Sequence, residues 1–243
     1  MLLELADYYS LLFLAPFLAL EIFWRARRYD APRGWRLRAL AVSLAAFGVS
    51  MGAGRLWAAV LPQWSLVDSA ALGTWGGAAV GIVLYELAHY WYHRAAHRFD
   101  WLWRLGHQVH HSAESLDAFG AYYLHPLDAA LFTTWAVLVF FPLLGLTPEA
   151  GAIASAFLAF NAAFQHANIG TPRWLGYLIQ RPESHGVHHG RGIHRYNYAD
   201  LPLWDIVFGT FRNPGRREIP VAAGFYCGAS TRLGAMLAWR AVT

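Results

Sequence analysis

The sequence predicts an all-α protein, an integral membrane helical bundle with a histidine-rich cap on its cytoplasmic side. Three observations lead to this fold class. The 243 residues are 57% hydrophobic and only 14% charged, whereas a soluble domain usually carries about 25% charged residues. Five apolar segments approach the ~20 residues that a helix needs to cross the hydrocarbon core of a bilayer. All twelve histidines lie between residues 89 and 194.

The apolar segments define the order of the predicted membrane helices. They cover residues 2–24, 37–61, 70–92, 127–146 and 148–166. The first contains Glu4, Asp7 and Glu21, so it could lie at the membrane interface instead of crossing the bilayer. The chain length suits a single membrane domain covering residues 1–243, with N-terminal membrane helices in residues 1–70.

The arginines predict how the chain is oriented in the membrane. Six of them lie between residues 25 and 38, and others follow the third and fifth segments, while the connections after the second and fourth segments have none. Basic residues favour the cytoplasmic side of a membrane, so we expect the N-terminus outside and the C-terminus inside. This placement explains the net charge of +4 without nucleic-acid binding.

The histidines are spaced as metal ligands on helices would be. His93 and His97 share a helix face, because residues four apart lie ~5–6 Å from each other. Two HxxHH groups, HQVHH at 107–111 and HGVHH at 185–189, each end in an adjacent pair. Adjacent side chains on a helix point ~100° apart, so each pair could reach two neighbouring ions. The two pairs together predict a dinuclear metal site in the cap.

Several kinds of protein remain possible at this point. Imidazole suits zinc, copper and iron, and the spacing does not identify the metal. The single cysteine, Cys227, excludes a site built from several thiolates. A zinc-dependent membrane lipid hydrolase needs only about three histidines, which leaves the HxxHH groups unexplained. A metal transporter would hold its ligands near the middle of the bilayer, and a structural membrane protein would need no metal.

Four side chains near the histidine groups are expected to support the metal site without binding the metal. We interpret His89 and His194 as hydrogen-bonding residues, since a lone histidine near a membrane interface more often has that role. Ligating histidines usually carry an acceptor on the far ring nitrogen. Glu86 and Asp205 are the carboxylates that we predict for this position.

The motifs taken together resemble the fatty acid hydroxylase/sterol desaturase superfamily over about residues 83–213. The resemblance rests on HRAAH, HQVHHS, the His125–Pro126 dipeptide, the solitary His166, and HGVHH followed by NY and WDIVFGT. Glu86 stands where an aspartate is common, and His89 where an aromatic residue is usual. The resemblance implies a catalytic region in residues 71–213 and a C-terminal tail in residues 214–243.

The superfamily implies a membrane-embedded di-iron enzyme that uses O2 to hydroxylate or desaturate a C–H bond of a fatty acyl, sterol or isoprenoid lipid. No catalytic residue beyond the metal ligands is expected. By position, the ligands would be His93, His97, His107, His110, His111, His185, His188 and His189, with His166 as a ninth and His125 as a ligand or a supporting group.

The expected reaction and the arginine pattern predict an electron donor and a location. The chain shows no flavin, haem or four-cysteine cluster motif, so the electrons would come from a separate ferredoxin or cytochrome. The expected location is a bacterial-type inner membrane, with the active site on the cytoplasmic face.

Overall fold

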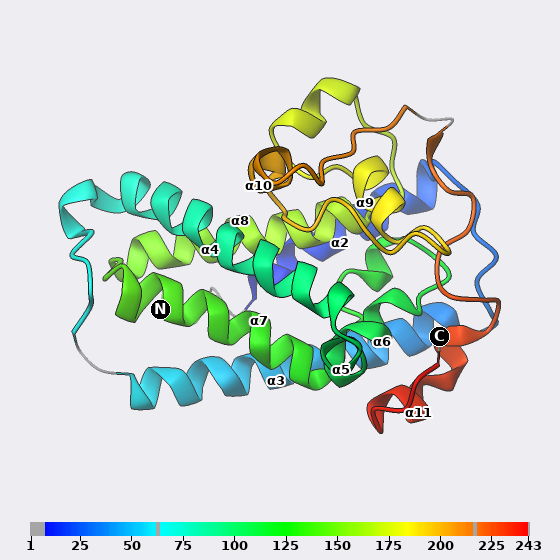
Figure 1. Ribbon diagram of the computed structural model, residues 1–243, viewed down its shortest axis with the longest axis horizontal. Coiled ribbons are helices and arrows are strands. Elements are labelled where there is room, and N and C mark those ends of the chain that lie inside the picture. The colour runs from blue at the N-terminus through cyan, green and yellow to red at the C-terminus, as the bar shows by residue number, and fades with distance from the viewer. Residues whose placement is uncertain (1–7, 62–63, 216–217, 243) are drawn as a thin grey trace.

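The computed structural model describes residues 8–61, 64–215 and 218–242, and within these ranges it is helical and has no β-strand. Gly190 and Ala223 form one isolated antiparallel bridge. Five longer helices run alongside one another in Figure 1: α2 (Tyr9–Phe23), α3 (Trp35–Val60), α4 (Gly73–Arg98), α7 (Pro126–Leu138) and α8 (Pro148–His166). The prediction of an all-α bundle is confirmed.

Three helical stretches in the described part of the chain are long and apolar enough to cross a membrane, where the sequence predicted five. They are Trp35–Val60, Ala70–Arg98 and Pro126–Leu143. The first predicted segment becomes α2, with 15 residues; residues 2–7 lie outside the described residues. The fifth becomes α8, with 19 residues. Polar side chains at Asn161 and Gln165 lower the mean hydropathy of α8.

Shorter elements connect the long helices and carry five of the twelve histidines. They are η1 (Ala70–Leu72), α5 (Asp100–Leu102), η2 (Trp103–His107), α6 (Gln108–His111), η3 (Ala118–Gly120), η4 (Val139–Leu143), η5 (Arg173–Tyr177), α9 (Pro182–His188), α10 (Pro202–Val207), η7 (Ala229–Arg232) and α11 (Leu233–Leu237). The η2 element is a turn of π-helix. Such turns are rare and often occur at functional sites, and this one leads directly into the first HxxHH group.

Prolines fix where several helices begin. Helices α7, α8, α9 and α10 all have a proline in their first turn, where its missing N–H costs no helical hydrogen bond. The residue before Pro148 is Thr147, whose hydroxyl accepts a hydrogen bond from the Ala150 N–H at 3.2 Å. Prolines therefore end the loops around the histidines at defined points.

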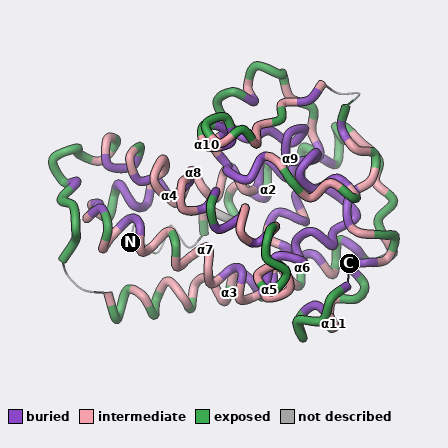
Figure 2. Tube along the Cα trace, viewed as in Figure 1, coloured by how far each residue is buried: buried purple, intermediate pink, exposed green. Residues whose placement is uncertain are grey.

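Burial differs between the two ends of the molecule. Figure 2 shows buried residues gathered around α6 and α9, while α3 and α7 are mostly intermediate or exposed along their length. Within each candidate span, only 22–28% of the most apolar stretch of residues is buried inside the protein. Exposed apolar helix surface is expected where lipid replaces water. The end containing α6 and α9 is packed like the interior of a soluble protein.

Gly145 joins η4 to α8 in a conformation that suits glycine, with φ of +57°. A Cβ at this position would lie 2.8 Å from the Val67 carbonyl oxygen. We expect Gly145→Ala to destabilise the protein by about 1–3 kcal/mol, because both the backbone angle and this contact become unfavourable. Thermal unfolding in detergent measures the change. Gly52→Ala is the matched control, because a Cβ at Gly52 meets nothing within 4 Å, and an unchanged stability of Gly145→Ala would contradict the prediction.

Candidate metal centre

Nine histidines converge in two groups at the buried end of the bundle. The first histidine group consists of His93, His97, His107, His111 and His188, and the second consists of His110, His166, His185 and His189. Within each group, one ring nitrogen of every member lies within 4.8 Å of the others. The members come from α4, η2, α6, α8 and α9, with His189 directly after α9, so the helical bundle brings together residues that are almost a hundred positions apart.

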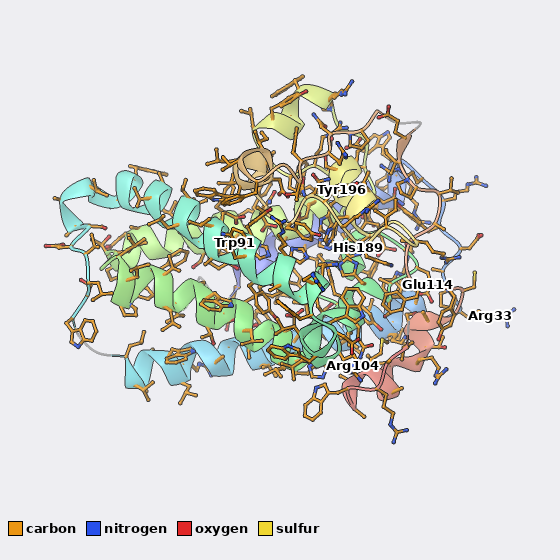
Figure 3. All side chains as sticks on the ribbon, viewed as in Figure 1. Arg33, Trp91, Arg104, Glu114, His189 and Tyr196 are labelled. Carbon is orange, nitrogen blue, oxygen red and sulfur yellow. The ribbon has the colours of Figure 1, made fainter. Side chains whose placement is uncertain are left out.

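The adjacent histidines of each HxxHH motif fall into different groups, as their helical spacing predicts. His110 belongs to the second group and His111 to the first, and His189 and His188 divide in the same way. The rings of His111 and His189 stack with their centroids 4.2 Å apart, so the two groups are immediate neighbours. Figure 3 shows His189 near the middle of the view, where it is buried, whereas Arg33 lies at the edge of the molecule.

Hydrogen bonds fix the outer nitrogen of several rings. The Nδ1–H groups of His93 and His188 donate to the carbonyl oxygens of Tyr198 and Tyr196, each at 2.7 Å. His107 Nδ1–H donates to Asp128 Oδ2 at 3.0 Å, and His166 Nδ1–H donates to the Ala162 carbonyl oxygen at 2.8 Å. A neutral imidazole that donates through Nδ1 has a lone pair on Nε2. These four rings therefore present Nε2 as an acceptor to the interior of the groups.

The inner nitrogens face one another at short distances. His188 Nε2 lies 3.0 Å from His111 Nε2, and His166 Nε2 lies 3.1 Å from His110 Nε2. Burial lowers the pKa of His110, His111 and His188 well below 6.5, so these rings are neutral. The buried Nε2 atoms of His93 and His107, which carry lone pairs, have no hydrogen-bond donor among the described residues, as expected of atoms that bind a metal.

The geometry fits metal ions held mainly by imidazole. Two nitrogens bonded to one ion at about 2.1 Å are about 3.0 Å apart if the bonds meet at a right angle, and about 3.4 Å apart at the tetrahedral angle. The Nε2 atoms of His185 and His166 are 3.0 Å apart, as are those of His189 and His185. The spacing and the five members of the first group favour a coordination number above the four of structural zinc.

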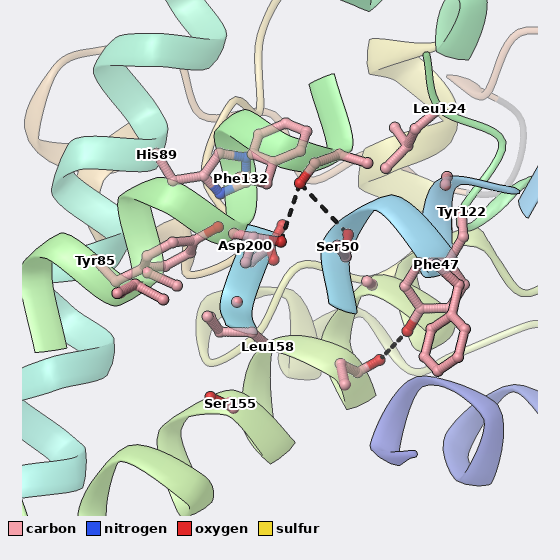
Figure 4. Close-up of a pocket in the computed structure, with 18 of the residues that line it drawn as sticks. Phe47, Ser50, Tyr85, His89, Tyr122, Leu124, Phe132, Ser155, Leu158 and Asp200 are labelled. Carbon is pink, nitrogen blue, oxygen red and sulfur yellow. Dashed lines mark hydrogen bonds between the residues drawn. The ribbon is translucent and has the colours of Figure 1, made fainter. Parts of the chain in front are cut away.

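A long, mostly apolar cavity of about 1030 Å³ leads to the histidine groups. Its lining includes members of both groups, among them His93, His107, His110, His166 and His185. It also includes Leu61 and Trp64, at the far end of α3, so the cavity runs along the bundle between the long helices. Figure 4 shows part of its wall, where apolar side chains such as Phe47 and Leu158 are mixed with a few polar ones.

Comparison with known proteins identifies the family of this chain. The family model for fatty acid hydroxylase matches residues 78–210, which include all nine histidines of the two groups. The chain belongs to the fatty acid hydroxylase family. The resemblance inferred from the motifs is therefore confirmed. No solved structure matches the chain.

Several curated relatives in this family act on lipids or lipid-like molecules by name. The human alkylglycerol monooxygenase is 35% identical over 158 residues, which cover 60% of this chain and 32% of the relative. An ornithine lipid hydroxylase of Rhizobium tropici is 31% identical over 141 residues, covering 56% of this chain and 42% of the relative. A very-long-chain aldehyde decarbonylase of rice is 29% identical over 139 residues, covering 54% and 52%. The chain matches only a third to a half of the length of these relatives.

The family's recurrent histidine in the His125–Pro126 dipeptide lies outside both histidine groups. The resemblance predicts His125 to be a metal ligand or a supporting group. Its Nδ1 accepts a hydrogen bond from the Leu127 N–H at 3.1 Å, and its Nε2 lies 3.5 Å from the Leu237 carbonyl oxygen. His125 caps the first turn of α7, which accounts for a histidine directly before proline without a metal.

The four predicted supporting residues have different positions. His194 Nδ1 lies 3.1 Å from His111 Nδ1, so it contacts the first group directly, and burial lowers its pKa to about 4. Asp205 contacts no histidine of the groups but accepts hydrogen bonds from the Tyr198 and Ala199 N–H groups at 2.8 and 2.9 Å. It thereby holds the loop whose carbonyl oxygen binds His93. Glu86 and His89 form a separate cluster with Asp200.

Sequence reasoning missed Asp128, the carboxylate that binds a group histidine directly. Asp128 is fully buried, and besides His107 it accepts a hydrogen bond from the Tyr92 hydroxyl at 2.5 Å. Gly106 lets it approach, since a Cβ at Gly106 would lie 2.9 Å from the Asp128 Cβ. The sequence feature that could have identified Asp128 is its position three residues after His125, in the first turn of α7. Glu114 and Glu183, closer to the HxxHH groups in sequence, instead bind backbone N–H groups of Ser230 and Thr171.

Proposed function

We propose that this protein is a membrane-bound di-iron oxygenase that hydroxylates a C–H bond of a lipid held in the apolar cavity. The observation that carries the proposal is the pair of neighbouring histidine groups in the wall of that cavity. The nine proposed ligands are His93, His97, His107, His110, His111, His166, His185, His188 and His189. Two iron ions would supply the reductive activation of O2 that an unactivated C–H bond requires.

The residues of the chain have three tasks in this proposal. Carbonyl oxygens and Asp128 hold the Nδ1 side of the rings, which orients Nε2 toward the metal. The buried setting of the rings excludes water from the reacting carbon. The walls of the cavity hold an apolar chain so that one carbon lies beside the histidine groups.

Hydroxylation is favoured over the alternatives that the sequence left open. Monooxygenases and hydroxylases occur repeatedly among the relatives, and a zinc-dependent hydrolase does not account for nine converging imidazoles. We propose that the electrons come from a separate ferredoxin or cytochrome at the cytoplasmic face of a bacterial-type inner membrane. Arginines that follow the third predicted segment, such as Arg94 and Arg98, would lie at that face.

Lipid mass spectrometry tests this function. Cells expressing the gene are expected to contain a lipid heavier by one oxygen atom than in cells without it, and growth under isotopically labelled O2 should place the label in that lipid. The purified protein is expected to hold two iron ions per chain. A label that enters from water would indicate hydrolysis or hydration, and a lipid lighter by two hydrogens would indicate desaturation. An unchanged lipid profile in cells whose membranes contain the iron-loaded protein would contradict the proposal.

A further inference from the structure

A third cluster of possible metal ligands lies beside the histidine groups. Glu86 and His89 come from successive turns of α4, and Asp200 comes from the loop before α10. One ligand atom of each lies within 4.8 Å of the others, and all three residues are buried. His89 and Asp200 line the apolar cavity, and Figure 4 shows them close together on its wall, near Tyr85. The proposed oxygenase reaction does not use this cluster.

The cluster contains buried atoms that other groups of the protein do not satisfy. Glu86 Oε2 accepts hydrogen bonds from the Asp200 and Leu201 N–H groups at 2.7 and 3.2 Å. Glu86 Oε1 and His89 Nδ1 are buried and have no hydrogen-bond partner among the described residues. His89 Nδ1 lies 3.8 Å from Glu86 Oε2, which is too far for a hydrogen bond. Leaving such atoms unpaired in a protein interior is costly.

The charges of the cluster also need a partner. Glu86 and Asp200 are two buried carboxylates beside a membrane helix, and no arginine forms an ion pair with either of them among the described residues. Burial, and then the nearby charge of Glu86, raise the pKa of Asp200 to about 7. Uncompensated buried charge is strongly unfavourable. A divalent cation would bring the cluster to neutrality, and carboxylate with imidazole suits Mn²⁺, Fe²⁺ or Zn²⁺.

Two amide side chains bind Asp200 through their NH2 groups. Asn161 Nδ2–H donates to the Asp200 carbonyl oxygen at 3.0 Å, and Gln165 Nε2–H donates to Asp200 Oδ1 at 2.8 Å. The oxygens of both amides are buried and accept no hydrogen bond within the part of the chain that the structure describes. Buried oxygen atoms without a hydrogen-bond donor therefore occur on both amides that bind Asp200, as on Glu86.

We propose that Glu86, His89 and Asp200 bind a third divalent cation, separate from the two histidine groups. The site would adjoin the first histidine group, because the His89 ring stacks on the His93 ring at 5.4 Å with an angle of 3° between their planes. This inference does not depend on the identity of the lipid or on the oxygenase reaction.

Equilibrium dialysis of the full chain in detergent against Mn²⁺ tests the third site. The metal-stripped wild-type protein is expected to bind one equivalent of Mn²⁺ more at saturation than Asp200→Asn or Glu86→Gln. Both variants remove one negative charge but keep an oxygen that can accept the existing hydrogen bonds. Mn²⁺ is also expected to raise the unfolding temperature of the wild type more than that of either variant.

Glu114→Gln is the matched control for this experiment. Glu114 is buried, with Oε1 accepting the Ser230 N–H at 3.0 Å and Oε2 unpaired among the described residues, yet it is not part of a ligand cluster. It is expected to bind as much Mn²⁺ as the wild type. If a carboxylate variant does not fold, His89→Gln provides the same comparison. Equal Mn²⁺ binding by the wild type and the cluster variants, or an equal loss in Glu114→Gln, would overturn the third site. If the wild-type protein bound Mn²⁺ at the third site but not at the histidine groups, the result would instead count against the di-iron proposal.

Discussion

Replacing both His188 and His189 by alanine is expected to remove iron from both histidine groups and to lower product formation by more than about 100-fold. The two residues are adjacent in α9 and its C-terminal end, but each belongs to a different group. His188 Nε2 lies 3.0 Å from His111 Nε2, and His189 Nε2 lies 3.0 Å from His185 Nε2. Loss of a residue that merely supports a ligand costs about 10–100-fold in metal affinity or activity, so loss of two ligands should cost more.

Metal content and lipid product per chain measure this effect, with His125→Ala as the control. His125 is also a buried histidine, but it lies outside both groups. Its replacement removes the cap of α7 and should cost about 0.5–2 kcal/mol of stability while leaving two iron ions bound. The proposed ligand set would be wrong if the double variant kept its iron, or if His125→Ala lost as much iron as the double variant.

The sequence predicted the structure best where helical periodicity determines which way the side chains point. Two adjacent residues on a helix must point their side chains in different directions, so spacing alone predicted that His110 and His111 belong to different histidine groups. The long apolar helices α3 and α4 followed from length and hydropathy in the same way. The predicted membrane span at residues 148–166 became α8, which is not among the three candidate spans. Its sequence is mostly apolar, but Asn161 and Gln165 use their polar side chains to bind Asp200.

Contacts between distant parts of the chain were not predictable from local patterns. Asp128 and His107 are 21 residues apart, and Asp200 is 114 residues from Glu86. Only the packing of α7 against η2, and of the loop before α10 against α4, brings these pairs together. His125 shows the reverse case. Its motif position suggests a ligand or a supporting group, while in the structure it lies outside both histidine groups and caps the start of α7.

Asp128→Asn is expected to weaken metal binding in the first histidine group by about 10–100-fold and to leave the second group largely unchanged. Asp128 Oδ2 accepts from His107 Nδ1–H, and Oδ1 accepts from the Tyr92 hydroxyl. An asparagine has only one acceptor oxygen, and its NH2 group would face one of these two donors. If the NH2 faces His107, the ring must turn or move its proton to Nε2, the nitrogen that the metal needs.

Competition between the protein and a chelator for iron measures this loss, and Tyr92→Phe distinguishes its cause. The phenylalanine variant removes one donor to Asp128 but keeps the acceptor for His107, so it should cost only about 0.5–1.5 kcal/mol of stability and little metal affinity. Both variants leave the packing between α4 and α7 nearly unchanged in volume. Equal losses of iron in the two variants would therefore mean that Asp128 acts by holding α7 against α4, and not by fixing the proton of His107.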